Sequence, residues 1–361
     1  MTADALWGHY DAVRDALAEQ YRLPMNPATG IAPEALLVKA QQYLVTTGAA
    51  KPRIIQRAEM LRMLLSDAAI RVDPDDWFAD HIDTGRVLWK VQQQWMNEAG
   101  KKLGLNGWRL DDCAFGRLDL SHTSPGWHNV LKYGATGLRD RAKAALATAA
   151  DEEAADFFRA VIIVGEAMRV YILRLAAEAE RLGAQRVIAT LQALAERPPE
   201  SFHEALQWSL LFNQVQEIEG EYVRSQGVFD QLFFPYYDAD LRSGRLAREQ
   251  AKELIYFYFD KFAAQHFGAG NNICFGGRDA VGKDLCNDLT RLCLEVFAER
   301  KMIDPKLSLR IHRNTPPDIL AQAVDAVRNG ANAIVFANDD IAFEMFMRHG
   351  KQPEDIVDFV P

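Results

Sequence analysis

The stretch from Pro198 to Leu241 reads PPESFHEALQWSLLFNQVQEIEGEYVRSQGVFDQLFFPYYDADL, and we expect the rest of the chain to be organised around it. Ser201 followed by Glu204 forms a capping box, which predicts that a helix begins there. Apolar residues cover most of the circumference of this helix, so it should be buried. After Gly220 the stretch turns polar and then ends in an aromatic run, Phe229–Tyr237. Polar groups among aromatic rings indicate the wall of an internal site or a buried hydrogen-bonded corner.

The composition is that of an ordinary soluble globular protein. Of the 361 residues, 49% are hydrophobic and 25% are charged, which fits one large domain or a small one with a large one. The net charge of −9, without a block of Lys or Arg, argues against nucleic acid and against anionic membranes as partners. The N-terminus lacks a signal-peptide pattern, and the four cysteines form no CxxC motif. We therefore expect a cytoplasmic location.

Upstream of the opening stretch, the sequence predicts helices with little chemistry. Residues 1–105 show mainly helical patterns and should form an N-terminal helical layer. Residues 154–182 should form a long central helix. Between them, an extended segment is followed by a loop that contains His122. Catalytic groups are often placed in loops of this kind, but a surface turn in which His122 caps the next helix is the alternative.

Downstream, strands and helices alternate. Strands are predicted at residues 271–277, 306–312 and 333–338, and helices at 283–300, 315–330 and 339–349. This order implies parallel strands joined by crossover helices.

The strand at residues 306–312 alternates strictly, which places Ser308, Arg310 and His312 on one face. A polar face is unusual in a parallel sheet, because helices normally cover both faces. The pattern therefore indicates a barrel interior or a cleft. The alternative is that Arg310 is neutralised by a buried Asp or Glu.

Several motifs occur in the order typical of one enzyme family. They are His122–Gly134 (similar to GHxxPxYxxVLxxG), Pro198–Gln207 (PPxTFxEALQ), Ser225–Tyr237 (SxGRxDQxxxPYY), Gly276–Thr290 (GGxDxxGxDxxNxLS), Leu307–Arg310 and Asn338–Asp339. Through them, residues 115–361 resemble the glycyl radical enzymes of the pyruvate formate-lyase-like family, in the branch of dehydratases, decarboxylases and C–N lyases. Val228 departs from the pattern, since the family usually has Arg there, and so does Ala247, where Thr usually caps the next helix.

The resemblance implies an α/β fold in which a helix-rich first half of a ten-stranded α/β barrel follows the N-terminal layer. Residues 106–361 would then form a parallel half-barrel of about five strands that ends before the radical cysteine loop. In the family, one loop carries a cysteine that becomes a thiyl radical and another carries the glycine that stores the radical. None of the four cysteines here has that sequence context, and no such glycine loop is present, so we expect this chain to be inactive alone.

The resemblance also implies a function and a set of site residues. The complete enzyme would be a lyase that carries out radical elimination, decarboxylation or C–C cleavage on a small polar substrate. His122 would be a polar or acid–base group at the substrate, and Ser225 would hydrogen-bond a substrate hydroxyl or carboxylate. Other residues expected to line the substrate site are Phe115, Phe275, Asp119, Arg310 and Asn338. No metal and no directly bound cofactor are expected.

The expected partners follow from the same resemblance. A radical-SAM activase would install the glycyl radical, and a C-terminal half or complementing subunit would supply the missing loops. An open half-barrel leaves a sheet edge and an apolar face uncovered, which favours association, and we expect a homo-oligomer. The alternative function is that of a non-catalytic scaffold or partner subunit that retains the fold.

Overall fold

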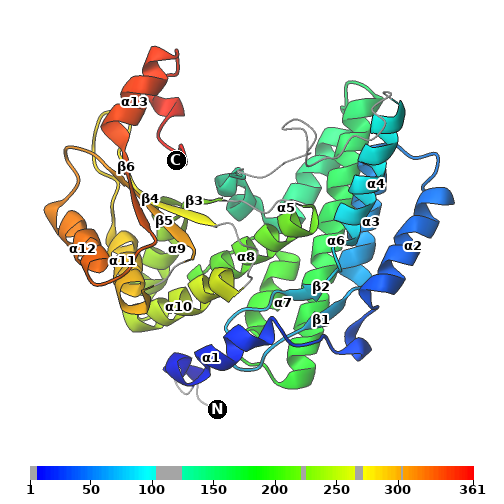
Figure 1. The fold of residues 1–361 in the computed structure, drawn as a ribbon, viewed down its shortest axis with the longest axis horizontal. Coiled ribbons are helices and arrows are strands. Elements are labelled where there is room, and N and C mark those ends of the chain that lie inside the picture. Colours follow the sequence, from blue (N-terminus) through cyan, green and yellow to red (C-terminus); the bar gives the residue numbers. More distant parts are fainter. Residues whose placement is uncertain (1–5, 103–123, 221–224, 265–270, 302–303) are drawn as a thin grey trace.

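The computed structural model describes residues 6–102, 124–220, 225–264, 271–301 and 304–361. Figure 1 shows a helical region on the right and an α/β region on the left. The helical region comprises α1 (Tyr10–Gln20), the 3-10 helix η2 (Pro27–Thr29), α2 (Pro33–Val45), α3 (Arg53–Asp67), β1 (Ala69–Arg71), β2 (His81–Asp83), α4 (Val87–Lys102), α5 (Trp127–Leu146), α6 (Glu152–Leu182), α7 (Ile188–Glu196) and α8 (Phe202–Ile218). The α/β region comprises β3 (Ser225–Val228), α9 (Phe229–Ser243), α10 (Arg248–Ala264), β4 (Asn272–Gly276), α11 (Asp288–Arg300), β5 (Lys306–Ile311), α12 (Pro317–Arg328), β6 (Ile334–Asn338), α13 (Asp339–Arg348) and the 3-10 helix η4 (Pro353–Asp355).

The long helix α6 lies at the centre of the helical region, as the sequence predicted. It begins at Glu152, where the side chain of Asp151 accepts a hydrogen bond from the Ala154 amide at 2.8 Å. It packs against α3, α5 and α7. Gly165 lets α5 approach closely, because a Cβ at this position would lie 2.8 Å from the Cβ of Arg139. The domain boundary expected at residues 105–106 lies outside the described residues.

Helix α8 confirms the expectation of a buried helix in the opening stretch. The Ser201 hydroxyl accepts from the Glu204 amide at 3.3 Å, so the predicted N-cap is present. Leu206, Trp208 and Leu211 are fully buried. The Trp208 indole N–H is satisfied by the carbonyl of Val130 on α5, at 2.8 Å. The helix thus joins the helical region to the hydrophobic core of the α/β region.

The α/β region is built on a four-stranded sheet in the order β3-β4-β5-β6, with every neighbouring pair parallel. The strand–helix order predicted for residues 271–349 is confirmed. Within the described residues the sheet has these four strands, so the half-barrel of about five strands stays a prediction. Strand β3 lies in a part of the opening stretch that the sequence marked only as polar.

The two faces of the sheet differ sharply. Ile273, Phe275, Leu307 and Leu309 are fully buried and join the hydrophobic core that the helices of this region share. The opposite face carries Asn272, Ser308 and Arg310, and we call it the polar sheet face. After α13 the chain turns back toward the sheet, as the red segment that ends at C shows in Figure 1.

Three helix starts predicted from the sequence were wrong. The helix expected from residue 283 begins at Asp288, because residues 277–287 form a loop and Asn287 supplies the cap. Pro316, not Thr315, is the N-cap of α12, since the Thr315 hydroxyl accepts from the His312 amide instead. Asn338, not Asp339, caps α13, because the Asp339 carboxylate turns toward Arg310.

No helix in the described parts of the chain is long and apolar enough to cross a membrane.

Candidate functional site

Two glycines open the turn that follows β4. Gly276 and Gly277 have positive φ angles of 70° and 94°. A Cβ on Gly277 would lie 2.8 Å from the guanidinium carbon of Arg310 and 2.9 Å from a carboxylate oxygen of Asp339. Only glycine meets both the backbone conformation and the space available here. The Gly-Gly pair therefore lets the loop close over a buried ion pair.

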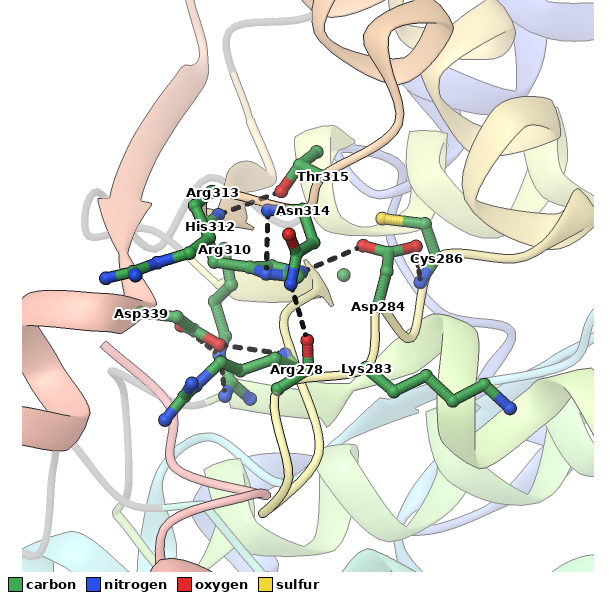
Figure 2. Close-up of polar contacts among 12 residues, drawn as sticks. Arg278, Lys283, Asp284, Cys286, Arg310, His312, Arg313, Asn314, Thr315 and Asp339 are labelled. Carbon is green, nitrogen blue, oxygen red and sulfur yellow. Dashed lines mark hydrogen bonds and ion pairs between the residues drawn. The ribbon is translucent and has the colours of Figure 1, made fainter.

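That ion pair joins β5 to the start of α13. The Arg310 Nε donates to Asp339 Oδ1 at 2.8 Å, and Nη2 donates to Oδ2 at 2.8 Å (Figure 2). Both side chains are completely buried. The Arg278 amide also donates to Asp339, at 3.0 Å. Of the two interpretations of Arg310 that the sequence left open, neutralisation by a buried acidic residue is confirmed.

A second polar cluster lies beside the ion pair at the carboxyl ends of the strands (Figure 2). His312 Nε2 lies 3.0 Å from Asp284 Oδ1, and its Nδ1 accepts from the Asn314 amide at 3.3 Å. Because Nδ1 accepts, Nε2 is the ring nitrogen that donates to Asp284. The other Asp284 oxygen accepts from the Cys286 amide at 3.0 Å. Burial, with help from nearby carboxylates, raises the pKa of the Cys286 thiol, so it stays protonated.

Ser225 begins β3, where the strand register pairs it with Asn272. Its hydroxyl accepts from the Gly227 amide at 3.0 Å, and its carbonyl accepts the indole N–H of Trp127 at 2.8 Å. Asn272 accepts in turn from the Ser308 hydroxyl, at 2.9 Å. The structure thus places Ser225 at one end of a polar row that crosses three neighbouring strands.

The other predicted site residues in the described ranges have different surroundings. Phe275 is completely buried on the apolar face, and its ring centroid lies 5.7 Å from that of Phe229. Asn338 is exposed and caps α13 by accepting from the Ile341 amide at 3.2 Å. The structure therefore brings Ser225 and Arg310 to the polar side of the sheet, but not Phe275. Phe115, Asp119 and His122 lie outside the described residues, and the substrate roles of all seven predicted residues stay predictions.

The sequence interpretation assigned no role to Asp230, whose surroundings are unusual. This fully buried carboxylate accepts from the Gly276 amide at 2.8 Å and from the Thr290 hydroxyl at 2.5 Å, both through Oδ2. Oδ1 has no partner within the described residues. Burial raises the pKa of Asp230 to about 7. The departure at Val228 was the available signal, because the family usually has a charged Arg at this position, two residues before Asp230.

Asn272 was also missed, although it lies in the predicted strand at 271–277 and on the same face as Cys274. Strand alternation alone would have placed it on the polar sheet face.

A cavity of about 510 Å³ opens in the helical region, between β2, α4 and α8. None of the predicted site residues that the structure describes lines it. Among the described residues, no cluster of three or more His, Cys, Asp or Glu side chains could hold a metal ion.

Comparison with known proteins gives a consistent result. The chain matches the pyruvate formate lyase-like family over residues 116–360. It is 28% identical to (2S)-3-sulfopropanediol dehydratase of Klebsiella oxytoca over 270 residues, which are 66% of this chain and 33% of the relative. It is 27% identical to isethionate sulfite-lyase of Nitratidesulfovibrio vulgaris over 267 residues, which are 64% of this chain and 32% of the relative. In both alignments the chain spans about a third of the relative.

Solved structures show the same fold. One solved structure, described for 1,2-propanediol dehydration in Roseburia inulinivorans, aligns with 96% of this chain. The alignment covers 52% of the chain in that structure, with a TM-score of 0.79 and 20% identity. Hydroxyproline dehydratase from Clostridioides difficile, with trans-4-hydroxy-L-proline bound, matches 95% of this chain and 53% of its own, with a TM-score of 0.79 and 18% identity. The family match begins ahead of α5, ends in the segment after α13 and includes every strand of the parallel sheet. The chain therefore belongs to the pyruvate formate lyase-like family, the family of the glycyl radical enzymes.

Proposed function

We propose that this chain is the N-terminal portion of a glycyl radical lyase that removes a small group from a small polar substrate by radical elimination, decarboxylation or C–C cleavage. The observation that carries the proposal is the family match over residues 116–360, on a fold shared with radical dehydratases along 95–96% of the chain. The relatives named above include a dehydratase and a sulfite-lyase, both of which eliminate a group from their substrates.

We propose Ser225 as the described residue that contacts such a substrate. Its hydroxyl oxygen accepts from the Gly227 amide, so in the described contacts the hydroxyl proton is available as a donor. A donor of this kind suits a substrate hydroxyl or carboxylate oxygen. We propose His122 as its polar or acid–base counterpart, on the motif that begins at His122. Arg310 differs, because its buried ion pair with Asp339 gives it a role in holding the site together.

The sheet supports the proposal of a complementing half. Within the described residues β6 pairs only with β5, and Val335 and Phe336 on it are 53% and 40% exposed. The following helix exposes further apolar side chains, namely Ile341, Met345 and Met347. An unpaired strand edge beside apolar side chains is a site for pairing with another segment. We propose that a C-terminal half of the family's barrel covers it and brings the thiyl cysteine and glycyl loops.

The test mixes this chain with a C-terminal half, taken from the adjoining reading frame or from 3-sulfopropanediol dehydratase. A radical-SAM activase is added under anaerobic conditions. Size-exclusion chromatography first verifies that the two halves associate. Electron paramagnetic resonance should then detect a glycyl radical, and the chain alone should give none. Folded, associated halves that yield no radical would contradict the proposal and favour a scaffold role, and turnover by the chain alone would contradict it as well.

A further inference from the structure

The segment at residues 357–361 lies across the polar sheet face and is held there by polar side chains. Arg310 Nη1 donates to the Val357 carbonyl at 2.7 Å and to the Phe359 carbonyl at 3.3 Å. The Asn272 amide donates to the Pro361 carbonyl at 3.0 Å. The two anchoring side chains come from neighbouring strands, β5 and β4, so the segment crosses the sheet.

The planar guanidinium of Arg310 explains how one side chain does two tasks. Asp339 occupies Nε and Nη2, which leaves Nη1 on the far side of the fork to meet the backbone carbonyls. The group is completely buried, so these hydrogen bonds do not compete with water, and the Asp339 charge compensates for the desolvation. The guanidinium carbon also lies 4.3 Å from the centroid of the Phe359 ring, in a cation–π contact. A lysine ammonium has no such fork and could not make all of these contacts.

The apolar contacts of the segment hold a different part of it. Ile356 is 2% exposed, and the Phe359 ring meets that of Phe346 at a centroid distance of 5.5 Å. These contacts anchor the start and one side chain of the segment, but they do not orient its carbonyls toward the sheet. That orientation depends on Arg310 and Asn272.

The segment therefore ends beside the proposed substrate site. Asn272, which contacts Pro361, is the register partner of Ser225 on the next strand. We propose that Arg310 and Asn272 are positioning residues: they hold residues 357–361 against the polar sheet face and so place this segment in the wall of the site that contains Ser225. The hydrogen bonds from Arg310 and Asn272 establish where the segment lies, whereas its role in the wall of a substrate site rests on the proposed function.

The test measures amide hydrogen–deuterium exchange in the 361-residue chain, resolved by residue through electron-transfer fragmentation. The variant Arg310→Met/Asp339→Asn removes the carbonyl contacts without leaving a buried charge unpaired. We expect the Phe359 amide, which donates to the Ile356 carbonyl at 3.1 Å, to exchange at least about tenfold faster once the segment is released, while the strands exchange as before. Asn272→Ala should speed exchange of the same amide to a smaller extent, because it removes only the contact with Pro361. Arg313→Met is the matched control, because this arginine is 78% exposed and pairs with Asp340 away from the segment.

Two outcomes would overturn the proposal. One is unchanged protection of the Phe359 amide in the folded double variant, and the other is an unprotected Phe359 amide in the wild type. Should the double variant fail to fold, Phe359→Ala keeps the ion pair and removes the ring that contacts both the guanidinium and Phe346. Unchanged exchange in Phe359→Ala and in Asn272→Ala would then count against the proposal. The readout needs neither radical nor substrate, so a protected segment without a glycyl radical would refute the proposed function alone.

Discussion

Lys261→Met would remove an ammonium from a buried cluster that ties α10 to the loop between β1 and β2. The ammonium of Lys261 contacts Asp76 and lies 3.1 Å from Asp80 Oδ1. The side chains of all three residues are 5% exposed or less. Asp80 also accepts from the Tyr21 hydroxyl at 2.6 Å, and Asp76 accepts from the Phe78 amide at 2.9 Å. The variant would remove the ammonium from both buried carboxylates and leave the neutral donors Tyr21 and Phe78 in place.

The expected loss in unfolding free energy at pH 7 is about 4 kcal/mol, within the range of about 3–5 kcal/mol for breaking a buried ion pair from one side. Two features of the cluster support the size of this effect. Burial raises the pKa of Asp76 to about 6 even with Lys261 present. Burial also opposes ionisation of Asp80, yet the charge of Lys261 and other neighbours hold its pKa below the ordinary value. Without Lys261, both folded-state pKa values should rise above the unfolded value of about 4.

The pH dependence gives the sign of the effect. A carboxyl whose folded-state pKa is raised loses stability as pH increases from the unfolded pKa to the folded one. The deficit of Lys261→Met relative to wild type should therefore shrink between pH 7 and pH 5. Lys261→Met/Asp76→Asn should be less destabilised at pH 7 than the single variant, because one uncompensated charge has gone.

Urea unfolding, followed by tryptophan fluorescence at both pH values, measures these differences. Lys252→Met is the matched control on the same helix. Its partners Glu295 and Glu299 are 29% and 45% exposed, so the loss should stay near or below about 1 kcal/mol. A loss under about 1 kcal/mol for Lys261→Met at pH 7, or no recovery at pH 5, would refute the reasoning.

Three further predictions concern the carboxyl ends of the strands. Gly277→Ala should lower the unfolding free energy in urea by about 2 kcal/mol or more, through strain and a clash with Arg310, whereas Gly350→Ala, with open space around it, should cost only about 1 kcal/mol. Equal losses of unfolding free energy in the two variants would argue against the clash. Burial raises the pKa of Asp230 to about 7, so the unfolding free energy of the wild type should fall as pH rises from about 4 to 7. In urea titrations Asp230→Asn should flatten this pH dependence, and an equally steep slope in the variant would assign the effect to other groups. Iodoacetamide at pH 8 should alkylate Cys286 at least about tenfold more slowly in the native protein than in urea, because burial raises the pKa of the thiol. Site-resolved mass spectrometry measures the two rates, and equal rates would contradict the prediction.

Local pattern accounts for most of what could be predicted about this fold. The N-cap at Ser201, the apolar circumference of α8 and the strict alternation of β5 are encoded within a few residues, and the predicted helix and strand are both present. The order of strands and helices after residue 271 determined that the strands are parallel, because crossover helices return the chain to the same end of the sheet. The order of the motifs likewise determined the family.

Which polar groups meet was decided by tertiary structure alone. Lys261 and Asp76 are 185 positions apart in the chain, and no periodicity links them. The Asp339 carboxylate fits the pattern of a helix cap, yet it turns inward, because Arg310 on the neighbouring strand offers two charged donors in a buried site. Asn272 lies on the polar sheet face, as strand alternation predicts, but its contact with Pro361 requires the chain to fold back over the sheet. Sequence periodicity specifies which face a side chain takes, and only the packed sheet determines what lies opposite that face.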